Sequence, residues 1–242
     1  ETVIAALRAA PGARAHILHL SSAAALPAIR AAKAEGLPLS VETCPHYLVF
    51  DAERIPDGGT AFKCCPPIRS EANRDLLWAA LADGTIDFVA SDHSPATAAL
   101  KLAGDGDFGV AWGGISGLQL AFTAVFTEAR RRGHTLDEVL GWMSTATAAF
   151  AGLDDRGSIR IGARADLVAF APDRPFTVDA ATLRHKNPVT AYDGAALTGV
   201  ATATWAGGAR APRAGPPRDP RHGGPDARPG PYRYQADSPL GP

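Results

Sequence analysis

Two short segments of this chain end in side chains that can bind a metal ion or accept a proton. The first runs from Ala15 to Leu20 and carries His19 near its end. The second starts at Phe88 and ends on Asp92. Both are brief apolar runs of the kind that form buried strands. In β/α barrels the catalytic groups stand at the C-terminal ends of such strands, so the two segments indicate an enzyme site.

His19 and Asp92 each have a structural as well as a chemical interpretation. A neutral imidazole at His19 suits a divalent metal ion, but a lone histidine is commonly held by local hydrogen bonds. Asp92 is suited to bind a metal and move a proton, or to cap the turn that follows it. Ser94 lies in the same turn, where it could contact a substrate or simply close the turn. The residue types alone leave these alternatives open.

A third polar segment, residues 42–48, also follows an expected strand and contains Cys44 and His46. A structural zinc site built from these two residues with Cys64 and Cys65 is disfavoured. The C-x₂-C spacing is absent, and adjacent cysteines chelate one tetrahedral ion poorly. We expect His46 to lie near the substrate instead. An odd number of cysteines argues against a disulfide framework and favours a reducing, cytoplasmic compartment.

Two further segments have a backbone suited to contacting a small ligand. Cys65 is followed by two prolines, which fix the chain and would suit the presentation of main-chain groups. Gly113 and Gly114 allow close approach of a small planar polar molecule, or they form only a hinge. The sequence contains no phosphate-binding loop, dinucleotide fingerprint or H-E-x-x-H motif.

The composition is that of a globular protein with no strong overall field. The chain has 242 residues, of which 46% are hydrophobic, and a formal net charge of −1. This balance gives no sign of a nucleic-acid or membrane partner. No apolar run approaches the roughly 20 residues that a membrane-spanning helix needs.

The first part of the chain alternates strand and helix patterns. Strands are predicted at 15–20, 37–41 and 86–91, and helices at 21–35, 70–84, 116–131, 136–143 and 145–151. The segment from Pro95 to Gly114 is predicted to be a long loop over a site. The order of strands and helices implies an α/β fold with a parallel sheet, which a barrel can close.

The pattern changes from Gly157 onward. Short strands joined by turns are predicted at 157–162, 165–170, 176–178 and 200–205. Residues 208–242 are rich in Pro, Arg and Gly with almost no aliphatic side chains, so we expect a disordered tail there. The expected parts are therefore a barrel-like part (1–156), a small β-rich part (157–207) and this tail.

Taken together, these segments resemble the allantoinase family of cyclic amidohydrolases, whose relatives include dihydropyrimidinases and dihydroorotases. The resemblance extends over residues 1–207. The matching stretches, in order, are 19–22, 42–48, 62–64, 66–69, 91–95 and 112–115. The Ser-Asp-His-Ser-Pro form of residues 91–95, paired with Lys63-Cys64, favours allantoinases over the other cyclic amidohydrolases.

The resemblance implies a partial TIM-like (β/α) barrel of the amidohydrolase type and the C-terminal part of a small β-sandwich. It implies hydrolysis of the cyclic amide of allantoin to allantoate at a centre of two divalent ions, commonly zinc and sometimes cobalt. His19 and Asp92 correspond to two of the metal ligands, and Asp92 also to the group that moves the proton. Cys65 and Gly113 correspond to positions that offer main-chain groups to the substrate. Homotetramers are common in the family.

Four further ligands of such a centre have no counterpart in this sequence. Family members carry an earlier His-x-His pair, a carboxylated lysine and another histidine, and no His-x-His occurs here. We therefore expect the chain to be the C-terminal portion of an allantoinase, with little or no activity alone. The alternatives are another cyclic amidohydrolase, such as a dihydropyrimidinase, hydantoinase or dihydroorotase, and a non-catalytic interaction protein derived from the same fold.

Overall fold

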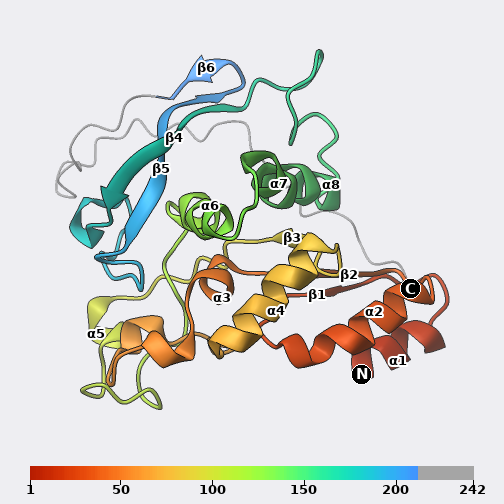
Figure 1. Cartoon of the computed structure of the whole chain (residues 1–242), viewed down its shortest axis with the longest axis horizontal. Helices are drawn as coiled ribbons and strands as arrows, with labels where there is room; N and C mark the ends of the chain where they lie inside the picture. Colours follow the sequence, from red (N-terminus) through yellow and green to blue (C-terminus); the bar gives the residue numbers. More distant parts are fainter. Residues whose placement is uncertain (212–242) are drawn as a thin grey trace, which may run out of the picture. The chain divides into compact units, whose positions relative to one another are not determined.

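A computed structural model describes residues 1–211 of the chain (Figure 1). The elements, in chain order, are α1 (Thr2–Ala9), β1 (Ala15–Ile17), α2 (Leu26–Ala34), β2 (Leu39–Thr43), α3 (Pro45–Val49), α4 (Glu71–Ala82), β3 (Phe88–Val89), α5 (Ala98–Lys101), α6 (Ala121–Arg131), α7 (Leu136–Leu140), α8 (Ala146–Phe150), β4 (Leu167–Thr177), β5 (Ala196–Ala206) and β6 (Ala209–Arg210). Short 3₁₀ turns and one π-helical turn, Gly141–Thr145, connect some of them. Most of the expected tail lies outside the described residues.

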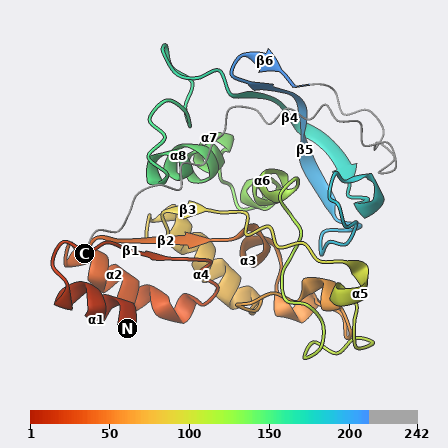
Figure 2. The ribbon, with the colours of Figure 1, turned by 180° about the vertical axis from the view of Figure 1, so that it is seen from behind.

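The first sheet is parallel, with the strand order β1-β2-β3. Helices α1, α2 and α4 lie on one side of β1 and β2, and α6, α7 and α8 lie beyond β3 (Figures 1 and 2). Along β2 the side chains alternate, so that Leu39, Val41 and Thr43 are buried while Ser40 and Glu42 are only partly covered. The predicted α/β fold with a parallel sheet is thus confirmed.

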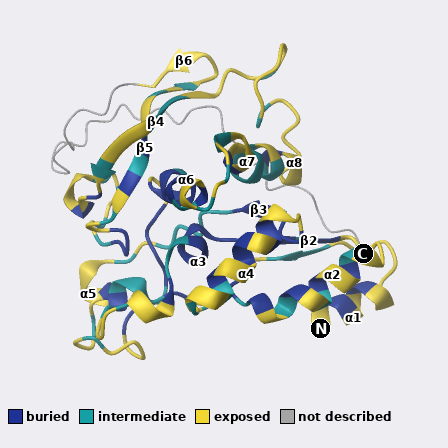
Figure 3. Cartoon of the chain, viewed as in Figure 1, coloured by how far each residue is buried: buried dark blue, intermediate teal, exposed yellow. Residues whose placement is uncertain are grey.

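Helix α4 shows how the local sequence sets one of the covering elements. The Ser70 side chain accepts a hydrogen bond from the Asn73 N–H, as expected for a helix cap. Leu77 and Leu81 then fall on one face and are buried in the core. Figure 3 shows that α4 has both buried and exposed parts. The helix predicted from Ser70 onward is therefore confirmed.

The second sheet is antiparallel, with the order β4-β5-β6. It is joined to the rest of residues 1–211 by α6, whose Phe126 ring packs edge-on against Phe170 of β4 at 5.2 Å. Gly199 of β5, at φ 108°, lies so close to Phe170 that any Cβ would collide with the ring. A glycine is therefore required for this packing.

Several details of the predicted elements are wrong. The strands predicted at 165–170 and 176–178 are one strand, β4, and the helix predicted from Ser116 begins only at Ala121. Residues 157–162 form turns rather than a strand, and Ile159 and Ile161 are almost completely exposed, at 90% and 105%. The long loop predicted between Pro95 and Gly114 is interrupted by α5. The β-rich part also extends beyond residue 207, because β6 pairs with the end of β5, with Ala206 opposite Ala209.

No helix among residues 1–211 combines the length and the apolar character needed to cross a bilayer.

Candidate functional site

The predicted site residues follow the C-terminal ends of neighbouring parallel strands. His19 comes two residues after β1, and Asp92 three residues after β3. Backbone hydrogen bonds tie both segments to β2, from Leu20 N to Glu42 O at 2.8 Å and from Ala90 N to Thr43 O at 3.0 Å. The sheet ladder therefore continues past the strands and fixes where both side chains begin.

His19 and Asp92 share an unusual backbone conformation. Their φ angles are 37° and 42°, in the left-handed region that residues other than glycine rarely adopt. Such conformations cost of the order of 1–3 kcal/mol and persist where the surrounding structure enforces them. The positive φ angle ends the extended backbone at each of these residues. The chain therefore changes direction at His19 and at Asp92, directly after the strands.

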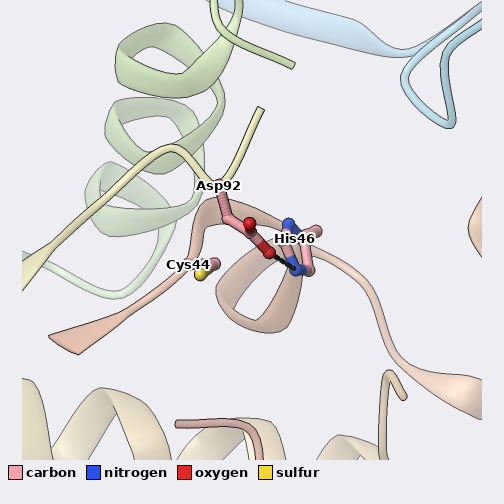
Figure 4. A group of neighbouring side chains, drawn as sticks. All are labelled: Cys44, His46 and Asp92. Carbon is pink, nitrogen blue, oxygen red and sulfur yellow. Dashed lines mark ion pairs between the residues drawn. The ribbon is translucent and has the colours of Figure 1, made fainter. Parts of the chain in front are cut away.

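Asp92 converges with side chains from the segment after β2. The Sγ of Cys44, a ring nitrogen of His46 and a carboxylate oxygen of Asp92 lie within 4.8 Å of one another (Figure 4). His46 Nε2 is 4.0 Å from Asp92 Oδ2. Cys44 and His46 are buried, whereas Asp92 is partly exposed. The Asp92 carboxylate is therefore the member of the cluster that solvent and a small molecule can reach.

The surroundings of the cluster favour neutral forms of its members. Burial, helped by the nearby His19 and Lys101, lowers the pKa of His46 to about 3. Burial also raises the pKa of Asp92, with His19 opposing and Glu42 reinforcing this shift. His46 is thus a neutral imidazole at physiological pH, and Asp92 is a carboxylate that takes up a proton more readily than an exposed one.

The cluster and the neighbouring His19, which is not one of the three residues whose ligand atoms lie within 4.8 Å of one another, offer the donor types that a divalent ion prefers. Two buried ring nitrogens, His19 Nδ1 and His46 Nε2, have no hydrogen-bond partner among the described residues. Together with the Asp92 carboxylate they supply nitrogen and oxygen ligands of the kind zinc prefers. The Cys44 thiol fits less well, because burial raises its pKa and it would have to lose its proton to bind.

A second group of predicted residues lies on two adjoining loops. The Sγ of Cys65 lies 3.2 Å from the point where a Cβ on Gly113 would stand. Ser94 donates its backbone N–H to the Ile115 carbonyl at 3.0 Å, and its side chain fills the space beside Gly114. The Ser94 segment thus connects the Asp92 turn with the loop that carries Gly113.

His93 and His16 have partners that account for them structurally. His93 Nδ1 accepts the backbone N–H groups of Gly117 and Leu118, both at 3.1 Å, and so closes the turn before α6. On β1, His16 is held between Ser40 at 2.8 Å and Glu42 at 3.1 Å, behind His19.

Sequence reasoning missed two residues that the structure places here. The sequence offers Cys44 only as one of four candidate zinc ligands, whereas the structure places it beside Asp92. Lys101 is not among the residues predicted from the sequence, but it is buried against the loops of Cys65 and Gly113. A lysine two residues after alanines in a Gly- and Ala-rich segment was the only available signal.

Comparison with known proteins identifies the family to which this arrangement belongs. The amidohydrolase family profile matches residues 1–210. The chain belongs to the amidohydrolase family. Among curated amidohydrolase relatives, it is 60% identical over 196 residues to an allantoinase of Streptomyces avermitilis, covering 81% of this chain and 43% of that protein. It is 46% identical over 202 residues to the allantoinase of Arabidopsis thaliana, covering 82% and 40%.

Solved structures of the same family have the same fold. The L-hydantoinase (dihydropyrimidinase) of Arthrobacter aurescens superposes with a TM-score of 0.81 at 28% identity, over 86% of this chain and 46% of that one. The dihydropyrimidinase of Brevibacillus agri gives 0.80 at 31% identity, over 86% and 46%. This chain therefore spans less than half the length of the amidohydrolases it resembles, and its sheet is a partial barrel of their type.

Proposed function

We propose that this chain carries part of the active site of an enzyme that hydrolyses the cyclic amide of allantoin to allantoate. The observation that carries the proposal is the convergence of Asp92 and His46 at the ends of parallel strands, 4.0 Å apart, with His19 close enough to shift both pKa values. The 60% identical relative named allantoinase supports allantoin as the substrate.

Asp92 is the residue that moves the proton. No hydrogen bond of the described residues uses its carboxylate, and the side chain is 34% exposed. Both oxygens are therefore available to a water molecule. The carboxylate takes a proton from the attacking water and returns it to the ring nitrogen as the amide bond breaks. The raised pKa of Asp92 helps this exchange, because the protonated state is less costly than on an exposed carboxylate.

Divalent ions, zinc first and cobalt as the alternative, complete the site, as in a binuclear centre. His19 and Asp92 would hold them, and the partnerless ring nitrogens fit this role. A bound divalent ion lowers the pKa of water and polarises the carbonyl that is attacked. His46 lies against the same carboxylate and stays neutral, so it adds no positive charge that would repel a metal ion.

The loops of Cys65 and Gly113 receive the substrate ring. Neither the backbone N–H nor the C=O of these residues takes part in any hydrogen bond among residues 1–211. An imide or urea edge of a hydantoin ring offers matching donors and acceptors. Main-chain groups held this way orient the ring relative to Asp92, which lowers the entropic barrier to reaction. Ser94 lies between the Asp92 turn and the loop that carries Gly113, and it is positioned to contact the same ring.

The test is a chimera in which the N-terminal part of the Streptomyces avermitilis allantoinase precedes Glu1. It is loaded with zinc or cobalt and assayed with allantoin, hydantoin, dihydrouracil and dihydroorotate. We expect allantoate formation with the highest kcat/KM for allantoin. Preference for dihydrouracil or hydantoin would instead support the second candidate, a dihydropyrimidinase or hydantoinase activity, which the structural neighbours favour. Absence of turnover on all four rings would refute both.

A cytoplasmic location and a homo-oligomeric state, such as a tetramer, belong to the same proposal. All three cysteines are free thiols, which agrees with a reducing compartment.

A further inference from the structure

Lys101, the last residue of α5, is a buried lysine with no carboxylate partner among residues 1–211. The residue is only 3% exposed. The ammonium donates to the carbonyls of Lys63 at 2.6 Å, Gly114 at 2.6 Å and Trp112 at 3.1 Å. Burial lowers its pKa to about 8, so it is still mostly protonated at pH 7. Three backbone dipoles thus hold a charge in the protein interior.

The three carbonyls belong to the two loops that carry Cys65 and Gly113. Trp112 and Gly114 flank Gly113 on both sides, and Lys63 stands two residues before Cys65. The Gly114 N–H also donates to the Lys63 carbonyl at 2.9 Å, so the two loops are directly linked beside the ammonium. The peptide groups of Gly113 and Cys65 themselves stay free of hydrogen bonds among the described residues. The ammonium therefore occupies the flanking carbonyls and leaves the central ones available.

We propose that Lys101 is a positioning residue: its ammonium clamps the loop 63–65 to the loop 112–114 and so sets the spacing of the main-chain groups that receive the substrate ring. This inference rests on the proposed function for what the loops bind, but the clamp itself is a property of the chain. Lys101 does not touch the reacting atoms, and it acts only through the two loops.

An ammonium group suits this position better than other side chains. It has three donors around one compact atom, matching three converging carbonyl oxygens. A neutral aliphatic side chain would leave these carbonyls buried without partners, and hydrogen bonds to charged groups are among the stronger ones in proteins. Loss of the ammonium should therefore allow the loops to separate locally, while the core around β2 and α4 stays folded.

The cysteines allow this local opening to be measured separately from global unfolding. Cys64 lies between Lys63 and Cys65 and is buried, and burial raises its pKa to about 11. Cys44 is completely buried beside the sheet and reports global unfolding. Cys65 is exposed, so its alkylation gives the rate of a thiol that needs no opening of the structure. Pulsed alkylation at pH 7, followed by mass spectrometry of the peptides, gives the three rates in one experiment.

The deciding comparison is between Lys101→Met and Lys33→Met. Lys33 is the matched control, because its ammonium is also held in place, by the Gly84 carbonyl and the Asp87 carboxylate, but contacts neither loop. We expect Lys101→Met to raise the alkylation rate of Cys64 at least about tenfold while that of Cys44 changes less than about twofold. In Lys33→Met the ratio of the Cys64 rate to the Cys44 rate should stay near that of the unchanged chain.

Chemical rescue separates a charged clamp from simple packing. Lys101→Ala leaves room for a small amine, so added propylammonium should restore protection of Cys64 in proportion to its concentration. The same concentrations of 1-propanol should not. If Lys101→Met does not fold, the rescue of Lys101→Ala by propylammonium still tests whether the charge holds the loops together.

Three results would overturn the proposal. One is an unchanged Cys64 rate in both Lys101 variants; another is a rise of Cys64 and Cys44 together; the third is equal rescue by 1-propanol. None of these measurements needs turnover. A chimera that makes no allantoate would therefore refute the proposed function and leave the clamp standing.

Discussion

At the scale of single residues, Asp92 combines a backbone constraint with a chemical role. Its φ of 42° is tolerated by aspartate and asparagine better than by most other residues. Its carboxylate is the one oxygen donor in the cluster with Cys44 and His46. An asparagine there should keep the backbone and lose only the proton exchange, whereas an apolar side chain would disturb both.

We therefore predict that Asp92→Asn in the chimera lowers kcat for allantoin by about 10²–10⁴, the range typical of a general acid–base group. Its melting temperature should stay the same or rise slightly, because a partly buried charge has been removed. Steady-state kinetics and thermal unfolding measure the two effects. Asp92→Asn with normal kcat would contradict the role given to this carboxylate.

Gly114, like Gly199, is a position that requires glycine. Its φ is 143°, and a Cβ would collide with the side chain of Ser94. Gly114→Ala should lower the free energy of unfolding in urea by about 1–3 kcal/mol. Gly36→Ala is the matched control, since Gly36 has a φ of 77° but nothing within 4 Å of a Cβ. Equal losses in the two variants would show that backbone strain alone, without the Ser94 contact, accounts for the effect.

At the scale of elements, the sequence predicts those that are fixed locally. Helix α4 could be predicted because Ser70 caps it and its leucines repeat on one face. The strand predicted at residues 157–162 is wrong, although Ile159 and Ile161 alternate with polar residues. A strand also needs a neighbour to bond to, and no described strand pairs there. Alternation shows which face would be buried but not whether a partner exists.

The same distinction applies to the candidate site. Each polar segment after a strand could be found from its own residues. The 4.0 Å approach of His46 to Asp92 could not, because it depends on the register of β2 against β3, with Thr43 opposite Val89. The contacts of Lys101 could not be predicted from the neighbouring sequence either, since its acceptors are backbone carbonyls of two other loops. Backbone acceptors carry no sequence signature.

Helix α7 offers a pH-dependent test of a local element. Thr135 and Glu138 form a reciprocal capping box at its start. Hydrogen bonds from the Thr135 backbone, then from His134 and the Thr135 hydroxyl, lower the pKa of Glu138 to about 2. Because this pKa is lower in the folded state, the stabilisation is complete above about pH 4.5 and is lost as the pH falls towards 2.

Glu138→Gln should therefore be less stable than the unchanged chain at pH 7, and the two should converge near pH 2. Urea unfolding at a series of pH values measures the difference. Thr135→Ala should lower the free energy of unfolding by about 1 kcal/mol at all these pH values, because the hydroxyl cap is lost. It should also lose the part of the Glu138 stabilisation that depends on the Thr135 hydroxyl and varies with pH. A constant gap between Glu138→Gln and the unchanged chain would contradict the assignment of the low pKa.

At the scale of the whole molecule, the chain spans less than half the length of the relatives it matches. In our proposal it contributes His19 and Asp92 to a metal centre that has further ligands in the family. We predict that the isolated chain with added zinc or cobalt forms allantoate no faster than its own Asp92→Asn variant. Robust turnover that depends on Asp92 would show that the residues of this chain suffice.

The strand order β1-β2-β3 has a consequence for how the purified protein behaves in solution. Among the described strands, β1 and β3 each bond to β2 on one side only. Their outer margins offer open N–H and C=O groups, which invite docking by any extended peptide. Sedimentation velocity at rising protein concentration should reveal reversible self-association through these margins.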